Sequence, residues 1–499
     1  MIAFLIISFS LIFFGYLAYR RILHFRTFSK HGISGPPPSF FTGNITQLRQ
    51  SGETPLTVMH TWGKKYGKIF GYFVGTRATL VVSEVNLVKE ILVKNRKSCG
   101  DRPPLIVKME PVTDTLVGLR GRRWSHVRGQ LSPIFAKASL REMGRTMAVC
   151  VAVTGEILAE KVNKRGGGGI DVWKLYQGLT CDVISRCALA MEVNSQRDND
   201  GDEFLAAVRG FLQHAMSPFI LLALCFPSIA KVAEVGMKAF GVSHLMTRMI
   251  MTSVTDALQN RRRGTTDRKQ NNNSYVDVLQ FMLNSGKLSD PEILANSWIF
   301  ILGGFETTAS ALTFSTLLLA QHQDVQEKLA SELEKVLGVD EIPTYDQIQN
   351  VKYLDKVVSE CLRLYPPVAT FVTRHVNRDM NFGGITLTSG STVQVPIWEI
   401  HHDPNLWPDP EHFDPERFNP AEKVGRHPMA FIPFGAGPRS CIGARFALTE
   451  IKMALAHIFM KFRVHAPPID WAPKLAVPTV TLVPGEEIKL TFSLRRNVS

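Results

Sequence analysis

FIPFGAGPRSCIGARFALTEIKMALAHIF, residues Phe431–Phe459, is the stretch of this 499-residue sequence that decides the fold. A loop rich in glycine and proline ends at Cys441, and a strongly helical segment follows directly. A cysteine at a helix start lies near the positive end of the helix dipole and near free N–H groups, which favour the thiolate. Glycines on both sides of Cys441 carry no side chain, so a flat, bulky group can approach the sulfur. The loop therefore predicts a soft thiolate ligand for iron, with Arg439 as a nearby fixed cation.

The same loop resembles the haem-binding signature of the cytochromes P-450, Phe-x-x-Gly-x-Arg-x-Cys-x-Gly. The matching positions are Phe434, Gly437, Arg439, Cys441 and Gly443. Further motifs of the family occur in the expected order: Trp-x-x-x-Arg in WSHVR, Glu-x-x-Arg in SECLRL, and a second arginine in PERF. The resemblance covers essentially the whole chain, and it implies a mainly α-helical fold with a minor β-sheet region.

The resemblance assigns several residues to the binding of haem b. Taken by themselves, Trp124 and Arg128 lie one helical turn apart, and a core tryptophan beside a solvated arginine is the common interpretation of such a pair. The residues that the family places around the cofactor are Cys441 as the axial thiolate, Phe434 and Gly435 in the same loop, and, at the haem propionates, Trp124, Arg128, Arg374 and Arg439.

A charged triad is also implied by the resemblance. Glu360 and Arg363 are three residues apart on a predicted helix, where such pairs are usually surface ion pairs that contribute a few tenths of a kcal/mol. In the cytochromes P-450 the corresponding pair is buried and is completed by the arginine of PERF, here Arg417. The triad is expected to hold the loop that presents Cys441.

The octet GGFETTAS, Gly303–Ser310, weakens the middle of a long apolar helix. The helix is predicted to start at the cap SDPE, Ser289–Glu292, and to run to about Gln321. Each glycine costs roughly 1 kcal/mol relative to alanine in a helix interior, and an unpaired buried carboxylate costs several kcal/mol more. A conflict of this kind in a buried helix indicates a functional site.

In the family that the chain resembles, this central helix passes over the distal face of the haem. The resemblance implies that Gly303 and Gly304 leave space beside the iron and that Glu306 and Thr307 form an acid–alcohol pair. Thr307 would orient a water molecule, and Glu306 would relay protons inward. The alternative for Thr307 is a hydroxyl that bonds back to the preceding helical turn.

The N-terminus predicts a membrane anchor over residues 1–20. The run Ile2–Tyr19 carries no charge and is just long enough to cross a bilayer, and positive residues follow it rather than precede it. This distribution predicts that the rest of the chain stays in the cytosol; a cleaved signal peptide is the alternative. A basic, proline-containing hinge is expected over residues 21–38, and a catalytic domain over residues 39–499.

The amino-acid composition limits the classes of partner that we expect for this protein. The formal net charge of +13 fits an anionic membrane or an acidic protein, and no motif supports binding of nucleic acid. The seven cysteines form no CxxC pair, which is typical of a protein in the reducing cytosol. Basic residues flank the Trp124 helix and the Cys441 loop, where the acidic microsomal reductase docks in similar proteins: Arg120, Arg122, Arg123, Lys423, Arg426, Arg439 and Arg445.

Two further segments are interpreted from their pattern. The apolar patch Ser217–Val232 is predicted as a buried loop, with a surface that dips into the membrane as the alternative. Arg261–Ser274 is predicted as a polar surface loop or connector.

Together these features predict a haem-thiolate monooxygenase, anchored by a single span in the endoplasmic reticulum and facing the cytosol. It would use O2 and electrons from NADPH, delivered by a reductase with cytochrome b5 as a further donor, to oxidise hydrophobic small molecules. The sequence most resembles the drug-metabolising group that includes thromboxane synthase. One alternative is therefore a lipid-peroxide isomerase, against which the intact Glu306–Thr307 pair argues, and another is a non-catalytic haem or electron-transfer protein.

Overall fold

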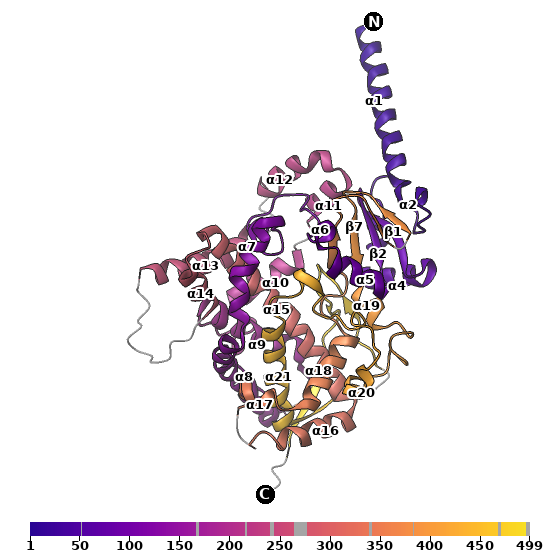
Figure 1. Cartoon of the computed structure of the whole chain (residues 1–499). Coiled ribbons are helices and arrows are strands. Elements are labelled where there is room, and N and C mark those ends of the chain that lie inside the picture. Colours follow the sequence, from indigo (N-terminus) through magenta and orange to yellow (C-terminus); the bar gives the residue numbers. More distant parts are fainter. Residues whose placement is uncertain are drawn as a thin grey trace.

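The long helix predicted from Ser289 crosses the centre of the molecule as α15 (Asp290–Gln321) (Figure 1). This structure is a computed structural model, and it describes residues 1–50, 52–165, 169–214, 217–239, 244–263, 277–338, 342–382, 384–467 and 471–495. Most of the predicted connector Arg261–Ser274 lies outside the described residues.

The start of α15 follows the predicted capping box. The backbone N–H of Ser289 donates to the Glu292 carboxylate at 3.0 Å, and a proline occupies the first turn. Nearly every residue from Leu302 to Ala320 is buried, because α15 is surrounded by other helices, above all α9 (Val172–Leu189) and α21 (Ala444–Lys461). The main hydrophobic core therefore forms around α15.

The remaining α-helices surround this centre. Their bounds are α1 Ile2–Phe25, α2 Thr27–Lys30, α3 Ile45–Leu48, α4 Pro55–Tyr66, α5 Val85–Lys89, α6 Arg96–Cys99, α7 Gly121–Leu131, α8 Lys137–Arg165, α10 Glu203–His214, α11 Pro218–Cys225, α12 Ala230–Ala239, α13 His244–Arg262, α14 Val278–Ser285, α16 Gln323–Glu334, α17 Tyr345–Ile348, α18 Lys352–Leu364, α19 Ile397–His401 and α20 Pro420–Lys423. A π-helical turn, η1, spans Glu90–Lys94, and short 3-10 turns are η2 Val112–Asp114, η3 Ser132–Phe135, η4 Pro227–Ile229, η5 Pro415–Phe418 and η6 Gly437–Arg439.

The strands form small sheets beside the helical core. The largest has the order β1-β2-β7-β4; β2 pairs with β7 in parallel, and the other neighbours are antiparallel. A three-stranded sheet has the order β3-β11-β8, and β5–β6 and β9–β10 are two-stranded. The bounds are β1 Ile69–Val74, β2 Arg77–Val82, β3 Ile170–Asp171, β4 Val372–His375, β5 Met380–Phe382, β6 Ile385–Leu387, β7 Thr392–Val395, β8 Phe462–His465, β9 Leu475–Ala476, β10 Val483–Pro484 and β11 Lys489–Leu494.

This architecture confirms the predicted mainly α-helical fold with a minor β-sheet region. Amphipathic patterns that predicted helices correspond to α4, α7 and α18, and the alternating patterns correspond to β1, β2 and β7. The sheet and the helical core are separate hydrophobic clusters. The Cys441 loop contributes to both clusters: Ile432 and Ala436 pack with the sheet, and Phe434 and Phe446 pack with the helical core.

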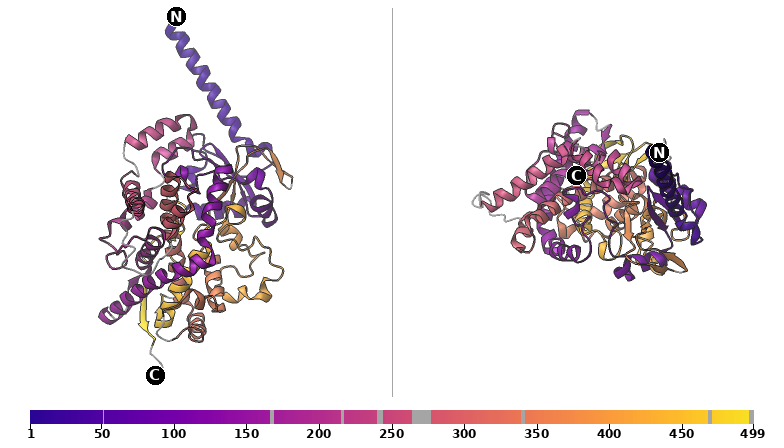
Figure 2. Two further views of the ribbon diagram at one scale, coloured as in Figure 1. Left: turned by 60° about the vertical axis from the view of Figure 1, so that its left-hand side comes forward. Right: turned by 90° about the horizontal axis from the view of Figure 1, so that it is seen from above.

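The apolar N-terminal run forms α1, which projects away from the body (Figures 1 and 2). Among the described residues, the stretch Phe4–Phe25 is the one helical segment long and apolar enough to cross a membrane. The helix continues past the predicted end of the anchor at residue 20, so the first basic residues, Arg20 and Arg21, lie within it.

The segment predicted as a hinge, residues 21–38, packs against the body of the protein. Arg21 donates to the carbonyls of Phe41 at 2.7 Å and Cys225 at 3.0 Å, and its guanidinium lies over the Phe226 ring. A side chain on Gly35 would meet the Gly71 carbonyl oxygen at 1.9 Å, so the proline segment runs directly along β1.

The apolar patch Ser217–Val232 is not the predicted buried loop. Ser217 caps α11 through the backbone N–H of Ile220, and α12 follows after one 3-10 turn. Ile220, Ala223 and Leu224 are buried, whereas Leu222 and Val232 are exposed. The pair of helices lies at the same end of the molecule as α1 (Figures 1 and 2).

Candidate functional site

Cys441 lies in the turn before α21. Its backbone N–H donates to the Phe434 carbonyl at 2.9 Å, which closes the loop, and its thiol is exposed, whereas the other six cysteines are buried. Burial among surrounding atoms raises the pKa of the Cys441 thiol, while the N–H of Gly443 and the charge of Arg128 oppose that shift. The N–H at the helix start and the neighbouring arginines thus act in the direction that favours the thiolate, and a bound metal ion would displace the remaining proton.

The glycines of this loop serve different purposes. Gly437 has a positive φ of 72°, and a side chain there would meet the Leu92 carbonyl oxygen of η1 at 1.9 Å. Gly437 is therefore required by backbone contact and not by access to the sulfur. Gly435 also has a positive φ, but only Val372 lies within 4 Å of the position of a side chain, as expected for a glycine that faces a bulky group.

Four arginines converge on the side of Cys441 that faces α7 and β4. Arg102, Arg128 and Arg374 come from the segment after α6, from α7 and from β4, and Arg439 comes from η6. Their charges act on one another: burial, together with Arg374 and Arg439, lowers the pKa of Arg102 to about 9. Burial and Arg439 lower the pKa of Arg374 to about 10. Such a concentration of positive charge requires an anionic partner.

Of these four arginines, Arg102 and Arg128 have side-chain N–H groups without a hydrogen-bond partner among the described residues. Nε and Nη1 of Arg102 are buried without a hydrogen-bond partner among the described residues. The side chain of Arg128 makes no hydrogen bond or ion pair in the described part of the chain, and its charge acts on Cys441. Arg374 donates to the carbonyls of Thr373 at 2.9 Å and Ala436 at 3.2 Å, so it also fixes the loop before Cys441.

Arg439, in contrast, is used mostly by the protein itself. It pairs with Asp101 at 2.6 Å, donates to the carbonyls of Gly100, Leu116 and Leu119, and stacks on the Trp124 ring at 3.9 Å. The structure therefore brings Arg439 and Trp124 together, but it leaves Arg439 little capacity for a ligand. Sequence reasoning did not find Arg102, whose segment CGDRPP carries no periodicity or motif that would distinguish it.

In the central helix α15, Gly303 and Thr307 are four residues apart and share one stripe of the helix surface, and Gly304 lies on another. A side chain on Gly303 would meet no atom within 4 Å, although the residue lies in the middle of the central helix. A side chain on Gly304 would meet Ile184 of α9 at 2.7 Å. Only Gly303 therefore provides open space, and Gly304 allows close packing of α15 on α9.

Glu306 and Thr307 differ in their surroundings. Thr307 donates its hydroxyl to the Gly303 carbonyl at 2.6 Å, which is the bond to the preceding turn that was the alternative to a catalytic role. Glu306 is buried, its Oε2 has no hydrogen-bond partner among the described residues, and burial raises its pKa to about 7. A carboxyl that titrates near neutrality is suited to the transfer of protons.

These observations fit a flat cofactor with an anionic edge, such as haem. Cys441 would offer a thiolate ligand, the open space at Gly303 would leave room along the central helix, and the side chains of Arg102 and Arg128 would provide cations for the acidic groups of the cofactor. No other pair of elements in the described chain combines an exposed cysteine with such donors.

The charged triad is linked to the segment before the Cys441 loop through His401, whose Nε2 accepts from the Ile432 N–H at 3.1 Å. Glu360 and Arg363 are fully buried and form a two-pronged ion pair, with Nε–Oε2 and Nη2–Oε1 distances of 2.8 and 2.7 Å. Arg417 approaches Glu360 at 3.4 Å. Arg363 also donates to the carbonyls of His401 and Pro410, so α18 is tied to the end of α19 and to the loop between α19 and η5.

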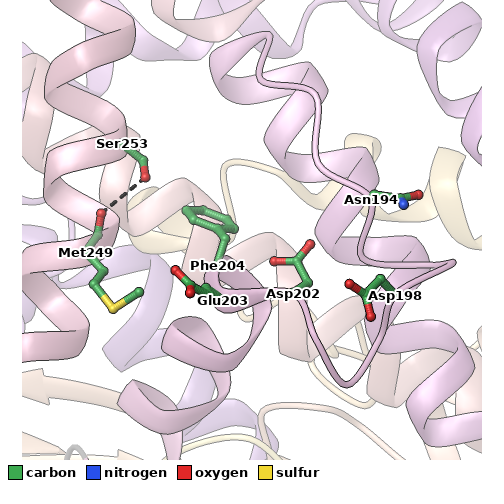
Figure 3. A pocket seen from close by; sticks show the side chains of 7 residues that line it. All are labelled: Asn194, Asp198, Asp202, Glu203, Phe204, Met249 and Ser253. Carbon is green, nitrogen blue, oxygen red and sulfur yellow. Dashed lines mark hydrogen bonds between the residues drawn. The ribbon is translucent and has the colours of Figure 1, made fainter.

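A separate surface pocket of about 350 Å³ lies between α13 and the segment before α10 (Figure 3). Its lining includes the carboxylates of Asp198, Asp202 and Glu203. Asp202 already accepts hydrogen bonds from Ser195 and from the backbone of Leu205. None of the residues predicted to hold a cofactor lines this pocket, so it is distinct from the site at Cys441.

Comparison with known proteins agrees with the motifs. The family model described as Cytochrome P-450 matches residues 33–492. Cytochrome P-450 3A31 of Mesocricetus auratus is 34% identical over 470 residues, which cover 89% of this chain and 88% of that protein. Cytochrome P-450 3A5 of Homo sapiens is 33% identical, with 87% and 86% covered, and thromboxane-A synthase of Rattus norvegicus is 31% identical, with 94% and 93% covered.

Proposed function

Because this chain belongs to the cytochrome P-450 family and is an oxidoreductase of the monooxygenase type, we propose that it oxidises hydrophobic small molecules with O2 and electrons from NADPH. Haem bound through a cysteine thiolate supplies the activation of oxygen and the insertion of one oxygen atom into the substrate. The observation that carries the proposal is the exposed Cys441 beside arginines with unpartnered donors that act on it electrostatically, and the open space at Gly303 of the central helix supports it.

Several residues of the chain would have distinct roles at the haem. Cys441 would ligate the iron, with Phe434 and Gly435 shaping the loop against the cofactor. Arg102 and Arg128 would neutralise the haem propionates. The stack of Arg439 on Trp124, together with Asp101, would hold the segment that carries Arg102 in place.

Arg374 would have two roles beside the Cys441 loop. It keeps the Ala436 carbonyl in place and adds positive charge beside Arg102. Behind the loop, the Glu360–Arg363–Arg417 triad would fix the segments that position Cys441, because its donors reach backbone carbonyls on neighbouring elements.

On the distal side, Glu306 would hold a proton and pass it toward Thr307. A pKa of about 7 means that the carboxyl is half protonated near neutral pH, so it can both accept and release a proton there. Thr307 would exchange its bond to Gly303 for one to a water molecule during turnover. Burial of the remaining face of α15 excludes bulk water from this path.

Electrons would reach the site at the basic surface beside the Cys441 loop. Of the basic residues that flank it, Arg122 and Arg445 are exposed and make no ion pair among the described residues, whereas Arg123 pairs with Glu292 and Arg426 stacks on Trp407. Arg122 and Arg445 are therefore the better candidates for docking an acidic reductase, or cytochrome b5. The helix α1 would anchor the protein in the endoplasmic reticulum membrane, with the body in the cytosol.

The absorption spectrum of the reduced, carbon-monoxide-bound protein tests the proposal most directly. The full-length protein is expected to give the spectrum of a thiolate-ligated haem, and Cys441→Ser is expected to lose it. Cys361→Ser, which changes a buried cysteine of the core, is the matched control and should keep the spectrum. Turnover of apolar substrates with reductase and NADPH would follow, and unchanged colour and turnover in Cys441→Ser would refute the assignment.

A second function is favoured by the likeness to thromboxane-A synthase. An isomerase of lipid peroxides would need neither NADPH nor a proton relay. Conversion of a lipid peroxide in the absence of NADPH, with Glu306→Gln as active as the unaltered protein, would identify that activity instead. We favour the monooxygenase because Glu306 is buried without an ion pair, at an energetic cost that an isomerase has no reason to retain.

A further inference from the structure

Asp101 connects three segments of the cofactor site. One oxygen of its carboxylate, Oδ1, accepts from Nη2 of Arg439 in η6 at 2.6 Å and from the backbone N–H of Gly121 in α7 at 2.9 Å. The backbone carbonyl of Asp101 accepts from the N–H of His375 in β4 at 2.8 Å. The loop before Cys441, α7 and β4 are therefore joined at a single residue.

The contact with Gly121 supplies a cap that α7 does not have in its own sequence. The residue before the helix, Arg120, makes no capping hydrogen bond with its side chain. The first N–H groups of a helix have no partner within the helix and carry the positive end of its dipole, so a carboxylate stabilises them. Asp101 provides this carboxylate from 20 residues earlier in the chain, and it thereby fixes the start of the helix that carries Trp124 and Arg128.

The contact with Arg439 determines the charge of the arginine cluster. Among the described residues, Asp101 is the one carboxylate that forms an ion pair with any of Arg102, Arg128, Arg374 and Arg439. The pair is enclosed, since the side chains of Arg439 and Asp101 are 2% and 17% exposed, and enclosed charges are screened less by water and salt. Asp101 thus cancels one of the four positive charges and leaves three to face an anionic cofactor.

We propose that Asp101 is a positioning residue of the haem site, whose Oδ1 fixes the start of α7 and whose negative charge beside Arg439 keeps the reduction potential of the haem low. The inference rests on the proposed function. Reduction of ferric haem adds one electron, which the reductase supplies, so a nearby negative charge favours the oxidised form. Because one oxygen makes both contacts, the charge can be removed while the acceptor is kept.

The test compares Asp101→Asn with Asp101→Ala. Asparagine keeps Oδ1 as an acceptor for both donors and lacks the charge, whereas alanine lacks the acceptor as well. The matched controls are Asp277→Asn and Asp277→Ala. Asp277 likewise pairs with an arginine, Arg261, at 2.9 Å and caps a helix, α14, through the N–H of Gln280 at 2.9 Å. In the part of the chain that the structure describes, it makes no ion pair with the arginines at Cys441.

The first measurement is a spectroelectrochemical titration of the haem-loaded proteins without substrate. Asp101→Asn is expected to move the midpoint to a more positive potential, so that the ratio of reduced to oxidised haem at the midpoint of the unaltered protein rises several-fold. Asp277→Asn should leave the midpoint in place. An unchanged midpoint in Asp101→Asn, or an equal shift in Asp277→Asn, would overturn the role of the charge.

The second measurement is hydrogen exchange of the backbone amides at the start of α7 in the same full-length proteins. Loss of the cap in Asp101→Ala is expected to speed their exchange about fivefold. Asp101→Asn and Asp277→Ala should exchange there like the unaltered protein. Equal protection of α7 in Asp101→Ala and the unaltered protein would overturn the positioning role. This readout needs neither thiolate ligation nor turnover, so it tests the contact even where the monooxygenase assignment fails.

Discussion

Two buried glutamates on neighbouring helices have opposite surroundings. Glu360 of α18 is enclosed by two arginines and by the backbone N–H of Asp414. Glu306 of α15 has no ion pair, and its Oε2 has no hydrogen-bond partner among the described residues. Burial raises the pKa of both carboxyls, but at Glu360 the charges of Arg363 and Arg417 oppose that shift, whereas no charge opposes it at Glu306. Burial alone therefore does not tell a structural acid from a reactive one; the partners do.

The largest effect is expected from breaking the paired site. Arg363→Ala leaves the Glu360 carboxylate buried without its main partner and removes donors from the His401 and Pro410 carbonyls. The free energy of unfolding should fall by about 3–5 kcal/mol, and the yield of haem-loaded protein should fall with it. Thermal unfolding and the haem content of purified protein measure both. Near-normal values in Arg363→Ala would mean that the triad does not hold the Cys441 loop.

Substitution of the unpaired Glu306 should lower the activity of the protein without destabilising it. Glu306→Gln is expected to lower turnover about a hundredfold while the haem spectrum persists, since the amide cannot transfer a proton. Burial raises the pKa of Glu306 from 4.5 to about 7, so the folded state loses stability as the pH rises between these values. Above pH 7 the variant should be more stable than the unaltered protein by up to about 3 kcal/mol. Denaturant unfolding at acid and alkaline pH checks this, and equal stability at both would contradict it.

A third buried glutamate sharpens the comparison. Glu450 of α21 is fully buried, and neither carboxyl oxygen has a partner among the described residues, so burial raises its pKa well above the usual range. Its nearest titratable neighbours include Cys150 of α8 and Cys187 of α9, and it does not act on Glu306 or Cys441. Glu450→Gln should leave turnover and its pH profile unchanged while it stabilises the protein at alkaline pH. A loss of turnover as large as that of Glu306→Gln would show that position relative to α15 is not what matters.

The smallest effect is expected where a pair is only half buried. His60 of α4 contacts the Glu399 carboxylate of α19 at 3.0 Å, and this contact raises the pKa of His60. Its stabilising contribution is complete below about pH 6.5 and is lost as the pH rises through the folded-state pKa. His60→Ala should cost less than about 1 kcal/mol at pH 5.5 and nothing measurable at pH 9, as followed by thermal unfolding.

The parts of the site that lie within one local motif could be predicted from the sequence. The cap at Ser289, the spacing around Cys441 and the Glu360–Arg363 pair each depend on residues a few positions apart, so their local geometry follows from helix and turn rules. Which of two adjacent glycines faces open space depends on where α9 packs, and the sequence does not contain that information in any local pattern.

The same limit applies to contacts between distant segments. Arg102 comes close to Cys441 only through the tertiary fold. Asp101 likewise takes up the donors of Arg439 that the resemblance had assigned to a ligand. Sequence reasoning identified the residues with unusual chemistry, but it could not identify the neighbours that set their protonation and direction.

The contacts of Arg21 have a practical consequence for producing this protein without detergent. Removal of residues 1–19 takes away most of the uncharged run but keeps Arg21 bound to the carbonyls of Phe41 and Cys225. Removal of residues 1–32 would delete Arg21 and Phe28 together, so α11 and β1 would each lose a neighbour. The shorter deletion should therefore give the more soluble, better-behaved sample, and the place of the cut matters more than the number of apolar residues removed.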